Sequence, residues 1–140
     1  MNRLCVLLML MLLLGTAACG KKVWPEPDES GEKFEITIAE SEMRNGCLDI
    51  KARISGNYRN LGRVILELEV SPEPCPTCPF LVTETAVFPP GSPGMTRDRD
   101  LLAITHCGLD QDKHYRFRIK ASNVYSAIRD VRSRVVTVPR

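Results

Sequence analysis

Beyond residue 33, apolar and polar residues alternate along most of this chain. Seven runs have strand character, and they span residues 34–38, 48–54, 64–70, 81–88, 101–104, 115–121 and 135–138. A period of two residues places one face of a strand in a core and the other face in water. Gly, Pro and Asn separate the runs, proline clusters exclude central strands at 72–79 and 89–93, and no stretch has a helical period. The pattern predicts an all-β sandwich of about seven antiparallel strands.

The first 18 residues have a different character. Met1-Asn2-Arg3 carries one positive charge, and residues 4–14 are almost entirely apolar. Eleven apolar residues span roughly 17 Å as a helix, which is well short of a bilayer core of about 30 Å. The segment is therefore predicted to be a cleaved signal peptide over residues 1–18, which leaves one small domain.

Small residues precede Cys19 in the order Thr16-Ala17-Ala18. This sequence resembles the bacterial lipobox, although Thr16 stands where Leu is usual. The resemblance implies that Cys19 is lipidated, with acyl chains such as palmitate holding the protein on a membrane. Gly20 follows Cys19 where Asp would retain an enteric lipoprotein, which implies the outer membrane, facing the periplasm. Cleavage by the general signal peptidase, giving a secreted protein with a free Cys19, is the alternative.

Residues 19–33 contain Pro and Gly without any period, and they are predicted to be a flexible tether. Trp24 in this tether is expected either at the membrane interface or against the domain. Without Arg3, the mature chain keeps 18 basic and 17 acidic residues and is nearly neutral. No basic excess points to a nucleic-acid partner.

The last third of the chain resembles a fibronectin type III domain. Leu109 lies six residues before Tyr115, and alternating apolar residues then lead to Asn123, as in that family. The resemblance implies a fibronectin type III or immunoglobulin-like sandwich over residues 34–140. It also implies that the Tyr115 hydroxyl closes the corner before its strand. The chain departs from the family in the second strand, where Ile54 stands near the usual core Trp.

Four cysteines remain after Cys5 leaves with the signal peptide and Cys19 takes lipid. Three pairings are possible, and an even number in a small exported domain indicates disulfides. The fibronectin-like layout places the start of the second strand beside the end of the fifth. It therefore implies a Cys47–Cys107 bridge and a local Cys75–Cys78 bridge.

The Cys75-Pro-Thr-Cys78 motif leaves three hypotheses open. A structural disulfide that stiffens a proline-rich loop is one. A redox-active dithiol is another, although such thiols usually need a helix N-terminus and a thioredoxin-like context. Metal binding through the cysteines and His106 is the third, and zinc would require four ligands. The interpretation that we carry forward is structural, with no metal and no cofactor.

Charged residues alternate on two of the predicted strands. Glu67 and Glu69 should face Arg116, Arg118 and Lys120 if the strands pair in one sheet, which would give cross-strand ion pairs. An anion-binding face is the alternative. The Arg97–Asp100 charges are expected in a solvated loop.

No phosphate loop, metalloprotease motif or nucleophile elbow occurs, so no catalytic residue is predicted and the protein is not expected to be an enzyme. Candidate binding residues are Phe80, Tyr125 and Ile128, which lie in predicted loops. The resulting hypothesis is a lipid-anchored binding or scaffold module of the cell envelope with a protein partner. A lipoprotein that assists assembly of another envelope machine is a related hypothesis. The alternative is a thiol redox or metal-handling lipoprotein acting through Cys75 and Cys78.

Overall fold

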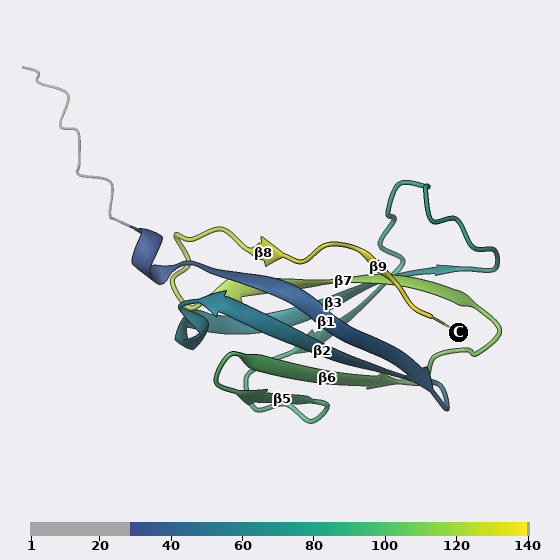
Figure 1. Cartoon of the computed structure of the whole chain (residues 1–140), viewed down its shortest axis with the longest axis horizontal. Helices are drawn as coiled ribbons and strands as arrows, with labels where there is room; N and C mark the ends of the chain where they lie inside the picture. Colours follow the sequence, from purple (N-terminus) through teal and green to yellow (C-terminus); the bar gives the residue numbers. More distant parts are fainter. Residues whose placement is uncertain (1–28, 140) are drawn as a thin grey trace, which may run out of the picture.

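The computed structural model describes residues 29–139, so the predicted signal peptide, Cys19 and Trp24 lie outside the described part (Figure 1). Two antiparallel sheets pack face to face, and this confirms the predicted β-sandwich. The first sheet has the order β1 (Phe34–Arg44), β2 (Cys47–Gly56), β6 (Leu101–Cys107) and β5 (Met95–Asp98). The second has the order β4 (Glu84–Phe88), β3 (Leu61–Ser71), β7 (His114–Asn123) and β8 (Val131–Arg132), and β9 (Val136–Thr137) also pairs with β7. Two short 3-10 turns complete the described elements, η2 (Glu29–Glu32) and η3 (Tyr58–Asn60).

The alternation in the sequence accounts for the core. The inward residues of the three long central strands are almost completely buried: Leu48, Ile50, Ala52, Ile54, Val64, Leu66, Leu68, Phe117, Ile119 and Ala121. Burying each of the larger aliphatic or aromatic side chains stabilises the fold by roughly 1.5–3 kcal/mol. The two sheets therefore need each other, because either one alone would expose an apolar face. No helix in the described part is long and apolar enough to cross a membrane.

A tight turn sets the register of the first sheet. Asn45 and Gly46 connect β1 to β2, and both have positive φ values, 50° and 73°. This is the Asn-Gly signature of a two-residue hairpin turn, whose twist matches that of the strands. The turn pairs Arg44 with Cys47, and the β2–β6 register then places Cys47 opposite Cys107.

The structure departs from the sequence prediction at three places. Residues Met95–Asp98, expected in a loop, form β5 at the edge of the first sheet, and only Met95 in this strand is buried. Such a short polar edge strand has no alternation to reveal it. Strand β4 begins at Glu84 instead of 81, because the Thr83 hydroxyl takes the Val70 N–H at 2.9 Å.

The third departure concerns the final strand, which is split into β8 and β9. Ser133 lies between them, and its hydroxyl accepts the N–H of Ile119 at 2.9 Å. A side-chain oxygen thus replaces a main-chain carbonyl in the ladder. The local pairing is interrupted there, so the predicted run 135–138 contributes only Val136–Thr137 as regular strand.

The sandwich has two distinct ends (Figure 1). The chain enters through η2 at one end, which we call the entry end. The β2–β3, β5–β6 and β7–β8 connections lie at the same end. The opposite end, the distal end, carries the β1–β2 hairpin turn, the β6–β7 loop and the long β3–β4 connection. We call this connection, residues 72–83, the disulfide loop.

Candidate functional site

Both predicted disulfides are present. Cys47 and Cys107 join β2 to β6 across the register pair, with their Cα atoms 3.9 Å apart. Cys75 and Cys78 bridge the disulfide loop locally, with their Cα atoms 5.4 Å apart. The first bridge locks the first sheet, and the second gives a rigid turn to a segment that has no regular secondary structure.

Tyr115 closes the corner between β6 and β7 as the sequence implied. Its side chain is buried, and the hydroxyl oxygen accepts the Asp110 N–H at 2.9 Å. Burial raises the pKa of the Tyr115 hydroxyl, while the Asp110 N–H opposes this shift. The hydroxyl therefore stays protonated and acts as a structural group.

The predicted cross-strand ion pairs also form. Glu67 lies opposite Arg118 and Glu69 lies opposite Arg116 in the β3–β7 register. Arg118 Nε bonds Glu67 Oε2, and Arg116 Nη2 donates to both carboxylate oxygens of Glu69 at 2.7 and 2.6 Å. Lys120 pairs instead with Asp130, at 3.0 Å. These cations are thus engaged by acids, which favours the structural interpretation over an anion-binding face.

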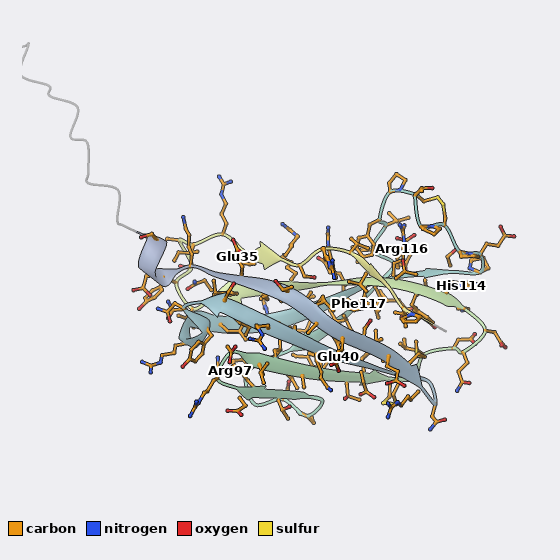
Figure 2. The ribbon with its side chains drawn as sticks, viewed as in Figure 1. Glu35, Glu40, Arg97, His114, Arg116 and Phe117 are labelled. Carbon is orange, nitrogen blue, oxygen red and sulfur yellow. A yellow bond between two sulfur atoms is a disulfide. The ribbon has the colours of Figure 1, made fainter. Side chains whose placement is uncertain are left out.

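Arg116 has a further role that the alternating pattern did not reveal. It lies on the outer face of the second sheet, yet its side chain is only 10% exposed because the disulfide loop folds over it (Figure 2). Its guanidinium donates to three loop carbonyls, those of Pro76 at 3.3 Å, Cys78 at 2.8 Å and Pro79 at 3.1 Å. We call Arg116, Glu69 and these carbonyls the arginine clamp. It holds both ends of the Cys75–Cys78 turn against the sheet.

The electrostatics of the clamp are favourable for both charges. The hydrogen bond from Arg116 lowers the pKa of the Glu69 carboxyl, which burial would raise, and the N–H of Leu81 donates to the same carboxylate at 3.0 Å. The buried carboxylate thus stays ionised. A buried charge with a full set of partners is tolerated, whereas one left alone is strongly destabilising.

Phe80, a predicted binding residue, is occupied within the domain. Its ring lies 5.0 Å from the guanidinium carbon of Arg118 and 5.9 Å from that of Arg116, and the residue is half-buried. Cation–π contacts of this kind attach the loop to the sheet. The next residue, Leu81, is instead 68% exposed, so it is the apolar side chain that this loop offers to solvent.

Tyr125 and Ile128 lie at the entry end, in the loop that follows β7, whereas Phe80 lies at the distal end. Tyr125 is 53% exposed, and Ile128 is half-buried beside a shallow groove that Lys33, Phe34 and Glu35 also line. The predicted binding residues therefore belong to two separate surfaces, one at each end of the sandwich. Sequence position alone could not distinguish these ends.

Three asparagines attach the incoming chain, a feature that the sequence analysis missed. Asn123 Nδ2 donates to the Glu32 carbonyl at 2.8 Å, and Asn60 Nδ2 bonds both this carbonyl and the Glu32 carboxylate. Asn57 donates to the Gly31 carbonyl at 3.1 Å. The last residues of the predicted tether are thus fixed to the domain through side chains of the β2–β3 connection and of the last residue of β7. The fibronectin-like spacing marked Asn123, but it gave no indication of its partner.

The surroundings of the cysteines and histidines offer little support to the thiol and metal hypotheses. His114 shares a hollow of about 30 Å³ with Cys75, which has room for a water molecule but not for a larger substrate. His106 packs edge-on against Phe88, with 6.4 Å between ring centroids. Within residues 29–139, no group of three or more His, Cys, Asp or Glu side chains is arranged to hold a metal ion.

In the Arg97–Asp100 segment, the side chains of Arg97 and Asp100 have partners within the domain. Arg97 Nη1 donates to the Tyr58 carbonyl at 3.3 Å, and Asp100 lies 3.9 Å from Arg53. The site with the most organised chemistry is therefore the disulfide loop with its arginine clamp. No known family model matches this chain, and no curated protein matches it in sequence.

Proposed function

We propose that this protein is a lipid-anchored binding or scaffold module of the bacterial cell envelope, without catalytic activity, built on a fibronectin type III-like sandwich. The signal-like residues 1–18 and the small residues before Cys19 support export and acylation. Two disulfides suit an oxidising compartment. Gly20 favours the outer membrane, facing the periplasm.

The fibronectin-like part of the proposal rests on strand order and on the Tyr115 corner. The second sheet, β4-β3-β7 followed by β8 and β9, corresponds to the C′-C-F-G order, and β1-β2-β6 corresponds to A-B-E. β5 adds a fourth strand beside β6, in the place of strand D of an immunoglobulin constant domain. The proposal therefore includes an immunoglobulin-like addition to the fibronectin-like layout.

One observation carries the binding role: the chain enters at one end of the sandwich, while a disulfide-braced loop projects at the other. The arginine clamp holds this loop in a fixed shape, with Leu81 and Val82 exposed at 68% and 36%. A rigid loop loses less conformational freedom on binding than a mobile one, so preorganisation favours recognition. The proposed partner is an envelope protein that contacts this loop.

Two measurements test the proposal. Mass spectrometry of the mature protein should find the acyl groups on Cys19, and an unmodified Cys19 would remove the anchor. In cells, a photo-crosslinking residue at Leu81 should trap one defined envelope protein, while the same residue at the exposed Leu101 of the other sheet should not. Equal labelling from both positions would contradict a specific surface.

The alternative is a thiol redox role of Cys75 and Cys78, for which one contact speaks. Cys78 is exposed, and the Arg116 guanidinium bonds its carbonyl, so a cation lies beside the bridge. A nearby cation stabilises a thiolate, which promotes exchange. In such a reaction a partner disulfide would be reduced to two thiols while Cys75 and Cys78 are oxidised. Thiol titration of the native protein decides, since two free thiols would favour this role and none would oppose it.

A further inference from the structure

Exposed arginines gather at the entry end. Arg59 comes from the β2–β3 connection, Arg99 from the β5–β6 turn and Arg129 from the β7–β8 loop. All three side chains are exposed, and within residues 29–139 none of them has an ion pair or a hydrogen-bond partner. Loops from both sheets thus present free positive charges at the same end of the molecule.

Two of these residues line surface depressions with the incoming chain, and the third lies on a turn at the same end. Arg59 lines a surface depression with Ser30 and Gly31, and Arg129 lines the neighbouring groove with Lys33. The β5–β6 turn reaches the same end, because the Asp100 carbonyl accepts the Ile54 N–H at 2.7 Å, two residues before Gly56. Figure 1 shows these connections around η2.

The acids at the entry end are largely engaged by other groups. Asp130 pairs with Lys120, Asp100 lies 3.9 Å from Arg53, and the Glu32 carboxylate accepts from Asn57 and Asn60. Among the described residues, the exposed acids Glu35, which lines the same groove as Arg129, and Asp98, at the end of β5, have no such partner. The free cations of this part of the chain, Arg59, Arg99, Arg129 and Arg132, outnumber these two acids, and Val124 and Tyr125 are 56% and 53% exposed on the same surface.

The distal end has no such set. Its exposed cations Arg44 and Lys113 lie 2.6 and 3.9 Å from the carboxylates of Glu42 and Asp110, and Lys51, midway along β2, lies 2.8 Å from Glu40. The nearly neutral domain thus separates its charges, with free cations where the chain enters and paired cations at the far end. Long-range attraction to an anionic surface would orient the molecule with its entry end first.

We infer that the entry end docks on an anionic phospholipid bilayer. Resting on the proposed anchor at Cys19, this inference adds an orientation to it. Nine residues lie between Cys19 and Glu29, which makes ten Cα–Cα steps, so the entry end can lie at most about 35 Å from the headgroups. Arg59, Arg99 and Arg129 bind the phosphates, and the Tyr125 ring lies at the interface, where amphipathic aromatics are favoured. The disulfide loop then points away from the membrane.

The test uses the full mature chain with Cys19→Ser, exported so that both disulfides form. It is mixed with phosphatidylcholine vesicles, with or without phosphatidylglycerol, at low and high salt. We expect binding only to the anionic vesicles, and loss of it at high salt. A triple variant, R59Q/R99Q/R129Q, should bind about 100-fold more weakly, from roughly fivefold per arginine near an anionic surface.

The matched control is R44Q/K51Q/K113Q, which removes the same charge from the distal end and from the middle of β2. It should bind as the parent does, and both triple variants should keep the parent's circular dichroism spectrum. The inference is overturned if the parent chain ignores anionic vesicles, or if the two triple variants lose equal affinity. Neither result bears on acylation, which mass spectrometry of the wild-type protein decides separately.

A depth measurement tests the orientation. In a Trp24→Phe background, Tyr125→Trp supplies the only indole, and lipids with brominated chains should quench its fluorescence in anionic vesicles. Leu81→Trp in the same background should not be quenched. Equal quenching of the two positions, or quenching of Leu81→Trp alone, would contradict the proposed orientation.

Discussion

Replacing Arg116 by Met tests the arginine clamp most directly. Removing one partner of a buried ion pair costs about 3–5 kcal/mol, because the other charge is left uncompensated. Here Glu69 is 14% exposed and keeps the Leu81 N–H, and the disulfide loop can lift to admit water. We therefore expect the lower end of the range, about 3 kcal/mol, or a melting temperature lower by roughly 10 °C for a domain of this size.

Urea unfolding followed by far-ultraviolet circular dichroism measures this change through the β-sheet itself. Arg44→Met is the matched control: its ion pair with Glu42 is 2.6 Å long, but the two side chains are 67% and 57% exposed. Loss of such a solvent-exposed pair should leave the free energy of unfolding almost unchanged. The double variant R116M/E69Q removes both charges and should recover part of the stability.

Two results would refute the reasoning about the clamp. One is an Arg116→Met variant that unfolds at the same urea concentration as the wild type, which would mean that Glu69 is hydrated at little cost. The other is a double variant that is no more stable than the single one. The second result would show that the lost hydrogen bonds to the loop carbonyls, and not the unpaired Glu69 carboxylate, account for the loss of stability.

Acid should weaken the same pair. The pKa of Glu69 is lower in the folded protein than in the unfolded chain, because Arg116 bonds its ionised form. The stabilisation is thus complete above the ordinary glutamate pKa of about 4.3 and is lost as the pH falls through the lower folded value. The stability difference between wild type and Arg116→Met should narrow below about pH 4. A difference that is constant with pH would contradict this linkage.

Three more sets of substitutions test the contacts that hold the sandwich together. Tyr115→Phe leaves a main-chain N–H without its acceptor and should cost about 1–3 kcal/mol in urea unfolding, whereas Tyr125→Phe should be neutral. Replacing both cysteines of the Cys47–Cys107 bridge by Ser opens a loop with a sequence separation of 60 and should lower the free energy of unfolding by about 4 kcal/mol. The same change at Cys75–Cys78, with a separation of 3, should lower it by about 2 kcal/mol. Equal losses would refute the loop-length argument. Asn123→Ala releases the Glu32 carbonyl, so hydrogen exchange at the chain entry should accelerate, and unchanged exchange would show that the attachment is redundant.

The sequence by itself determined the central strands and the two-layer core. A period of two residues is a local property, and it fixes which face of β2, β3 and β7 is buried without any knowledge of the partner strand. Asn45-Gly46 is a local hairpin signal of the same kind, although the strand prediction did not use it. The pairings of Cys47 and of Tyr115 followed once a sandwich layout was assumed, because each lies at the end of a strand whose neighbour that layout specifies.

The tertiary structure decided the features that depend on contacts between distant segments. The disulfide loop has no period, and its position is set by a guanidinium almost 40 residues further along the chain. The same holds for β5, which exists only because β6 offers it an edge, and for the asparagines that hold Glu32. The gathering of Arg59, Arg99 and Arg129 is likewise invisible in a nearly neutral sequence, because charge separation depends on which loops share an end of the sandwich.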